Sequence, residues 1–314
     1  MTVNVSEHGK CLATKPMPEL ARFALTEFMQ RTGIPMPSFD RSLLNDEVSK
    51  LVRAEAQTWD TGGLSPERLE RALACGIDMG RIVFRHLPLH VQVRIAVRTA
   101  LCVFVDDFDA GLENIAEFVE RFHDGRPQLH PLLDLLAGEL RRTPEYVHSY
   151  GAAGVVTSTV QFISSEVMER DAGTQPVSEV AQEFLVYRRL RNGIAEAYAF
   201  PIWEKTQFPS PSAHIQAVPA TMDFICYAND VLSFYKEELV GETENFIHNR
   251  ARITGKGVEA ALMDTMEDAV DAVNRARKIL RGDERQAWES FMEGYVMFHF
   301  LTPRYKLEKL LCSD

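Results

Sequence analysis

Three residues near position 230 have the types and the spacing to bind a metal ion together. Asn229, Ser233 and Glu237 lie in a stretch, residues 221–240, that has no Gly or Pro and whose apolar residues repeat at helical spacing. Residues four apart on a helix drift by only about 40° per step, so these three form one stripe. Because long helical side chains lean toward the N-terminus, Glu237 reaches back toward the two shorter side chains. The three oxygen-bearing groups then suit a hard cation such as Mg²⁺.

Lys236 lies beside this stripe and could hold an anion that the metal also binds. A metal with open positions next to a fixed positive charge indicates a phosphate-bearing ligand. Taken alone, however, Asn, Ser and Glu at steps of four are also typical of a solvated helix face.

A second acidic group far upstream favours the metal interpretation. Asp106, Asp107 and Asp109 follow an apolar run that begins near residue 95. Asp106 and Asp109 are three apart and share a helix face, whereas Asp107 points roughly 100° away. A solvated helix end explains these charges but not the apolar residues before them. Carboxylates in such a place repel one another and are costly to desolvate, and a divalent ion is the simplest remedy.

In their order along the chain, these motifs resemble those of class I terpene cyclases, the sesquiterpene synthases, and most closely the fungal trichodiene-synthase-like branch. The resemblance runs from about residue 40 to the C-terminus. Four motifs carry it: the aspartate-rich motif at Asp106, Arg189 with Asn192 and Gly193, the motif from Asn229 to Glu237, and the pair Arg304 and Tyr305. Of these, Arg189, Asn192 and Gly193 resemble the family's diphosphate-sensing arginine with its linker and effector positions.

The resemblance implies a fold, a reaction and a set of site residues. The implied fold is all-α, a single-domain class I isoprenoid-synthase helical bundle around a central active-site cavity. The implied reaction is Mg²⁺-dependent ionisation and cyclisation of farnesyl diphosphate to a sesquiterpene hydrocarbon or alcohol, with release of diphosphate. Three Mg²⁺ ions are expected, two at Asp106 and one at Asn229, Ser233 and Glu237. The expected catalytic and diphosphate-binding residues are Arg189, Lys236, Arg304 and Tyr305, and those lining the cavity near the cation are Phe298, Phe84, Phe104, Gly193 and Asn192.

One position departs from the family pattern. Ala110 occupies the fifth place of the aspartate-rich motif, and the carboxylate comes one place early, at Asp109. Asp106 remains the expected metal ligand, while Asp107 is left open and Asp109 could touch either a metal or an arginine. Two alternative functions also stay open. A chain-elongating prenyltransferase would usually carry two aspartate-rich motifs, and a non-catalytic helical scaffold finds its best support in Ala110.

Composition limits the remaining possibilities. The chain has 314 residues, of which 46% are hydrophobic, and 34 basic against 45 acidic residues give a formal net charge of −11. This charge argues against bulk attraction to nucleic acid or an anionic membrane. Five cysteines without metal-type spacing favour a reduced, cytoplasmic setting. The expected partner is a small-molecule isoprenyl diphosphate, with no integral membrane association, and the family makes a homodimer plausible.

The helical pattern must position these residues. No segment of useful length has strand periodicity. Residues 1–37 are predicted to be a tail with one short helix, and residues 38–314 the cyclase domain. The predicted helices cover residues 18–31, 41–59, 66–86, 88–107, 113–123, 131–142, 144–170, 177–200, 221–240, 258–280 and 284–299.

Overall fold

The computed structural model describes residues 16–42, 44, 46–107, 110–172 and 176–312, and in these ranges all regular structure is helical. The α-helices are α1 (Met17–Thr32), α2 (Asp46–Ala56), α3 (Pro66–Asp78), α4 (Leu89–Asp107), α5 (Leu112–Ala116), α6 (Phe118–Asp124), α7 (Pro131–Arg142), α8 (Ser149–Ala172), α9 (Gln182–Asn192), α10 (Ala195–Ala199), α11 (Val218–Val240), α12 (Phe246–Thr254), α13 (Val258–Ile279), α14 (Gly282–Leu301) and α15 (Leu307–Cys312). Shorter turns are the π-helix η1 (Met79–Val83) and the 3₁₀ segments η2 (Thr143–Glu145), η3 (Phe200–Ile202), η4 (Pro211–Ala213), η5 (Ile215–Ala217) and η6 (Pro303–Tyr305).

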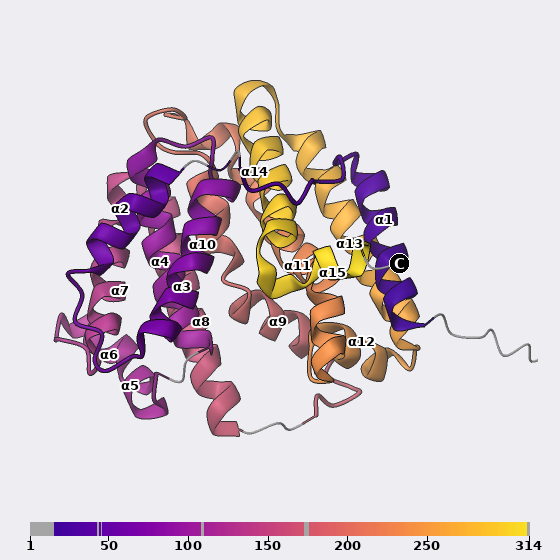
Figure 1. The fold of residues 1–314 in the computed structure, drawn as a ribbon, viewed down its shortest axis with the longest axis horizontal. Helices are drawn as coiled ribbons and strands as arrows, with labels where there is room; N and C mark the ends of the chain where they lie inside the picture. The colour runs from indigo at the N-terminus through magenta and orange to yellow at the C-terminus, as the bar shows by residue number, and fades with distance from the viewer. Residues whose placement is uncertain (1–15, 43, 45, 108–109, 173–175, 313–314) are drawn as a thin grey trace, which may run out of the picture.

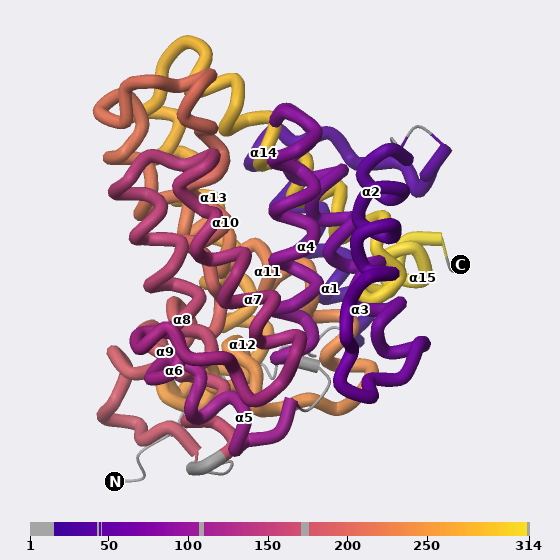
Figure 2. Tube along the Cα trace, turned by 90° about the vertical axis from the view of Figure 1, so that its left-hand side faces the viewer, coloured from indigo at the N-terminus to yellow at the C-terminus, as the bar shows by residue number. Residues whose placement is uncertain are grey.

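The helices form a bundle around α11, which lies near the centre of the view in Figure 1. Helices α2, α3, α4 and α7 pack together on one side, and α13 packs along α11 on the other. Figure 2 shows the same arrangement after a quarter turn, with α8 and α9 on the opposite flank from α2 and α3. The expected all-α fold is confirmed. No α-helix within the described ranges is both long and apolar enough to cross a bilayer.

Local sequence signals explain where several helices begin and end. Ser65 caps α3 by accepting a hydrogen bond from the backbone N–H of Arg68 at 3.3 Å, with Pro66 in the first turn. Helix α11 ends at Val240, and Gly241 follows with a φ of 71°, a conformation that glycine adopts without steric cost. These two boundaries follow the sequence closely, because capping depends on neighbouring residues alone.

The helix predicted over residues 177–200 is interrupted. Helix α9 ends at Asn192, and α10 begins only at Ala195. Between them Ile194 has a φ of 47°, which is rare for a β-branched residue and costs conformational energy. A Cβ at Gly193 would come within 2.8 Å of Arg189 and Cys226, so only glycine fits at this break. The periodicity of the flanking residues conceals the interruption, and Gly193 is its one local signal.

Further helix predictions differ from the structure. The stretch 41–59 is helical only over Asp46–Ala56, and the helix predicted from residue 177 begins at Gln182. The stretch 66–86 loosens into η1 after Asp78, and 113–123 divides at Glu117 into α5 and α6. Helix α8 begins at Ser149 instead of Pro144, because residues 143–145 form the separate turn η2. Helix α12 was not predicted at all. Its nine residues, Phe246–Thr254, are too few to show a clear period.

Helix α1 follows the tail but belongs to the main core. Its buried residues Leu25 and Phe28 join the same hydrophobic cluster as the rest of the bundle. The helix packs against α11 and α13, on the side of Figure 1 opposite to α2. The predicted division of the chain at residue 37 stays a prediction.

Candidate active site

Two adjoining cavities open where α4, α9 and α11 come together. The first, the acidic cavity, has a volume of about 350 Å³ and is lined by Asp106, Glu166, Glu169, Leu185, Arg188, Arg189, Asn192, Asn229, Asp230, Glu237, Glu242, Glu244, Asn245 and Phe246. The second, the aromatic cavity, has a volume of about 200 Å³ and is lined by Cys75, Met79, Thr99, Val103, Asp106, Arg189, Asn192, Gly193, Tyr198, Ile225, Asn229, Ser233, Lys236, Tyr295, Phe298, Arg304 and Tyr305. Asp106, Arg189, Asn192 and Asn229 line both, so charged and amide side chains lie between the acidic cavity and a cavity that has aromatic and aliphatic side chains among its polar ones.

The predicted stripe on α11 faces these cavities. Asn229 lines both, Ser233 lines the aromatic one and Glu237 lines the acidic one. The Ser233 hydroxyl donates to Glu237 Oε1 at 2.5 Å, as expected for residues four apart on a helix. Lys236 Nζ lies 3.7 Å from the same carboxylate oxygen. A hydroxyl, a carboxylate and a cation therefore meet at one edge of the site.

Asp106 faces this stripe from the last turn of α4. It lines both cavities, as Ser233 lines the aromatic one, so the two distant motifs meet in space. The guanidinium of Arg304, from η6, lies 3.8 Å from the Asp106 carboxylate. Asp109 and the side chain of Asp107 lie outside the described part of the chain.

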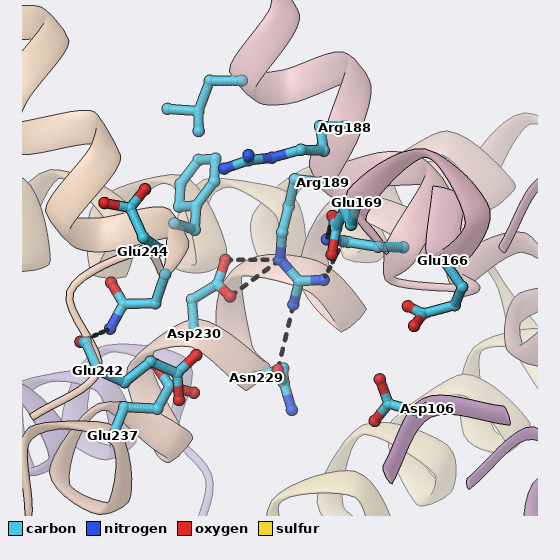
Figure 3. Close-up of a pocket in the computed structure, with 14 residues that line it drawn as sticks. Asp106, Glu166, Glu169, Arg188, Arg189, Asn229, Asp230, Glu237, Glu242 and Glu244 are labelled. Atoms are coloured by element: carbon cyan, nitrogen blue, oxygen red, sulfur yellow. Dashed lines mark hydrogen bonds and ion pairs between the residues drawn. The ribbon is translucent and has the colours of Figure 1, made fainter. Parts of the chain in front are cut away.

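Arg189 is the most extensively bonded charged group of the site (Figure 3). Its Nε donates to both carboxylate oxygens of Asp230, at 2.9 and 3.0 Å. Its Nη2 donates to Asn229 Oδ1 at 3.1 Å and to the Cys226 carbonyl at 3.0 Å. Burial opposes the charge on Arg189, but the charge and hydrogen bonds of Asp230, with Cys226 and Tyr295 nearby, together outweigh burial and raise the pKa above the ordinary arginine value. Arg189 therefore carries a fixed positive charge at the boundary of the two cavities.

The break after α9 brings two more predicted residues to the site. Asn192 and Gly193 both line the aromatic cavity. Asn192 Nδ2 donates to Glu169 on α8 at 3.2 Å, and its Oδ1 lies 3.4 Å from Arg189 Nη1. Asn192 thus links the arginine to α8.

Of the three phenylalanines expected at the cavity, the structure places one there. Phe298 lines the aromatic cavity, and its ring centroid lies 5.7 Å from that of Tyr305. Phe84 and Phe104 are not among the lining residues. Phe84 lies behind Tyr198, at 6.5 Å between centroids, and Phe104 packs on His130 at 4.8 Å. Thr99, Val103 and Asp106 follow one face of α4, and Phe104 projects from another.

The acidic cavity holds more negative charge than its own cations balance. Burial, with Asp106 and Glu169 nearby, raises the pKa of Glu166 to about 8. Burial also raises the pKa of Asp230 to about 6, against the opposing effect of Arg189. Glu242 has a raised pKa for the same reason, with Glu237 adding to the effect. Crowded carboxylates of this kind favour the entry of cations.

The residues present fit a hard divalent cation. Asp106, Asn229, Ser233 and Glu237 offer only oxygen donors, which suit Mg²⁺. Within the described ranges, no three His, Cys, Asp or Glu side chains converge closely enough to hold a metal by themselves. A cation here would therefore depend also on the amide and hydroxyl oxygens of α11 and on oxygens of a bound ligand.

Sequence reasoning missed three residues that shape the site. Asp230 pairs with Arg189, Glu166 faces the acidic cavity from α8, and His299 contacts Asn229 through a hydrogen bond of 3.1 Å. Asp230 is followed by Val231 and Leu232 in a largely apolar helix, which was a signal that a partner or ligand must compensate its burial. Glu166 gave a weaker signal, because polar residues lie close to it on both sides along the chain. His299 gave no such signal, because its spacing to Asn229 along the chain is unrelated to any helical period.

Known proteins share both the sequence and the fold. Residues 54–312 match the family model described as Trichodiene synthase (TRI5). Terpene synthase 29 of Postia placenta is 37% identical over 253 residues, which cover 78% of this chain and 73% of that protein. Monoterpene synthase 25 of the same fungus is 30% identical over 301 residues, covering 94% of this chain and 88% of the relative.

Two solved structures share the helical bundle at low sequence identity. Linalool/nerolidol synthase from Streptomyces clavuligerus superimposes with a TM-score of 0.61 at 14% identity, covering 85% of this chain and 98% of that one. Isoprene synthase from grey poplar leaves, in complex with three Mg²⁺ ions and dimethylallyl-S-thiolodiphosphate, gives a TM-score of 0.50 at 11% identity, covering 90% of this chain and 54% of that one. These likenesses show the fold alone.

The family model spans most of the chain, and the alignments with the two relatives include most of each relative's length. They confirm the family that the order of the motifs indicated. The chain is a member of the trichodiene synthase family of terpene synthases.

Proposed function

We propose that this terpene synthase ionises farnesyl diphosphate in an Mg²⁺-dependent reaction and cyclises the resulting cation to a sesquiterpene. One observation carries the proposal: Asp106 and Ser233, from motifs far apart in the chain, line one cavity together with Arg189, Lys236 and Arg304. Oxygen donors for a metal and cations for a diphosphate thus line the same space as the apolar side chains of Val103, Ile225 and Phe298.

The chain's own cations are arranged to favour departure of a diphosphate. Negative charge concentrates on the leaving oxygens as the carbon–oxygen bond breaks, so fixed cations stabilise the transition state more than the ground state. Lys236 lies 3.7 Å from the Glu237 carboxylate, and Arg304 lies 3.8 Å from that of Asp106. Both carboxylates are proposed metal ligands. Arg189 is the third cation that lines this cavity. The hydroxyl of Tyr305 is expected to donate a hydrogen bond to the diphosphate.

Mg²⁺ held by Asp106, Asn229, Ser233 and Glu237 would supply Lewis-acid stabilisation of the diphosphate oxygens. Three ions are proposed. The isoprene synthase structure, a complex with three Mg²⁺ ions and a thiolodiphosphate, supports this number.

The walls of the aromatic cavity suit a reactive hydrocarbon cation. Water would quench such a cation. Val103, Ile225 and Phe298 give this cavity apolar side chains against which the hydrocarbon part of the substrate can pack. The faces of Tyr198, Tyr295 and Phe298 can stabilise passing positive charge. Gly193, which lines this cavity, adds no side chain at the helix break and so leaves room there for the cation.

Geranyl diphosphate is a second candidate substrate. A relative that aligns over 94% of this chain is named a monoterpene synthase. Incubating the protein with each diphosphate and Mg²⁺, then identifying the volatiles by gas chromatography–mass spectrometry, decides between the two. Formation of a longer diphosphate from added isopentenyl diphosphate would instead support an elongating prenyltransferase.

Substitution of the proposed metal ligands tests the assignment of the site. Asn229→Ala and Glu237→Ala should abolish turnover while leaving the circular dichroism spectrum unchanged. Asn274→Ala, at an exposed position on α13, is the matched control and should retain full turnover. Unchanged turnover in Asn229→Ala would remove the metal-site assignment, and the absence of Mg²⁺-dependent diphosphate binding in calorimetry would support a scaffold.

A further inference from the structure

His299 lies at the centre of a buried hydrogen-bonded chain that ends at Arg189. The imidazole is 0% exposed and stands on α14 among aromatic rings, with centroids 4.8 Å from Tyr295 and 4.2 Å from Tyr305. Both ring nitrogens are engaged: Nδ1 lies 2.8 Å from the backbone oxygen of Tyr295, and Nε2 lies 3.1 Å from Asn229 Nδ2.

The direction of each hydrogen bond in this network is set by the two groups at its ends, the Tyr295 carbonyl and the Arg189 guanidinium. The Tyr295 carbonyl can only accept, so Nδ1 of His299 carries the proton. The Arg189 guanidinium can only donate, so the atom of Asn229 at 3.1 Å from it must be the amide oxygen. The amide N–H of Asn229 then points at Nε2 of His299, which accepts through its free lone pair. The donor and acceptor roles of the three hydrogen bonds are therefore mutually consistent, and they allow only one orientation of the Asn229 amide.

We infer that His299 is a positioning residue that holds the Asn229 side chain with its oxygen turned toward Arg189 and the cavities. This inference rests on the proposed function, in which that oxygen binds Mg²⁺. A reversed amide would present two N–H groups to a cation and would repel it. Neighbours that orient a metal ligand in this way commonly contribute ten- to hundredfold to metal affinity.

A purely structural role for His299 makes a different prediction. The ring also fills space between Tyr295, Phe298 and Tyr305. A side chain that only packs would affect stability without changing the affinity for Mg²⁺. The experiment must therefore measure Mg²⁺ binding and stability separately.

His299→Phe keeps a flat ring but removes both nitrogens, whereas His299→Gln keeps a hydrogen-bonding group. Mg²⁺ is titrated calorimetrically into each protein in the presence of saturating inorganic diphosphate, and the thermal midpoint is measured without Mg²⁺. For His299→Phe we expect Mg²⁺ binding weaker by about tenfold or more, and for His299→Gln binding close to that of the unchanged protein. His299→Leu, which has a smaller side chain, provides the same comparison where the phenyl ring does not fit.

The Asn229→Asp background separates orientation from other effects. A carboxylate has two equivalent oxygens and no amide to orient, so adding His299→Phe there should change Mg²⁺ binding little. Equal losses in the two backgrounds, or normal Mg²⁺ binding by a folded His299→Phe protein, would overturn the inference. If the unchanged protein itself shows no Mg²⁺-dependent diphosphate binding, the proposed function fails, and the inference fails with it.

Discussion

Replacing Arg189 by Met should destabilise the fold and abolish turnover by two separable routes. Met matches the length of the arginine stem but removes the donors that reach Asp230, Asn229 and Cys226. The Arg189 and Asp230 side chains are only 12% and 10% exposed, so the carboxylate would be left buried without its partner. Breaking a buried pair in this way costs about 3–5 kcal/mol in the free energy of unfolding.

Equilibrium urea unfolding at pH 7 measures this loss directly. At roughly 2 °C per kcal/mol for a domain of this size, the thermal midpoint should fall by about 6–10 °C. Adding Asp230→Asn to Arg189→Met removes the unpaired charge and should restore most of the stability. Turnover should stay absent in the double variant, because the guanidinium that faces the cavities is still missing.

Two outcomes would refute this reasoning. A loss below about 1 kcal/mol for Arg189→Met would place the pair in the range of exposed salt bridges. Failure of Asp230→Asn to recover stability would show that the cost does not come from the unpaired carboxylate.

Three further predictions concern packing, acid stability and charge. Gly76→Ala should cost about 1–3 kcal/mol of stability in urea unfolding, because the new methyl would lie 2.2 Å from the Ala96 carbonyl where α3 packs on α4. Gly138→Ala is the control, because its methyl would meet no atom within 4 Å. An equal loss in the control would contradict the steric argument. Burial lowers the pKa of His214 to about 4 in the folded protein. As the pH falls from about 6.5 to 4, the unfolded chain binds a proton at His214 that the folded protein does not, so the folded protein becomes less stable. The His214 ring stacks on Trp203, with centroids 4.5 Å apart, and His214→Phe keeps this stacking. The substitution should remove up to about 3 kcal/mol of that acid-dependent loss, and an unchanged pH profile of the unfolding midpoint would contradict it. Glu237→Gln should raise the Mg²⁺ concentration for half-maximal turnover by at least about tenfold, and an unaltered Mg²⁺ requirement would exclude this carboxylate as a ligand.

Where a property depended on neighbours along the chain, the sequence was a good guide. The residues of α7 were predicted over the full extent of Pro131–Arg142, because a proline start and an amphipathic period act within one helix. The stripe of Asn229, Ser233 and Glu237 also depends only on helical geometry, and the side chains lie on the predicted face of α11. Where packing competes with periodicity, as at the break marked by Ile194, the prediction of one continuous helix was wrong.

The residue order alone indicated an all-helical chain, because helical periodicity is a local property. The order of its motifs resembled this family, which the comparisons confirm, and it singled out two oxygen-rich motifs as the predicted metal site. Only the tertiary structure decided that Asp106 meets the α11 stripe, that Phe298 reaches the cavity while Phe84 and Phe104 do not, and that His299 touches Asn229. The physical reason is that helix crossings are set by the packing of many side chains at once. A pattern within one helix shows which face is apolar, but the partner of that face is chosen by the whole core.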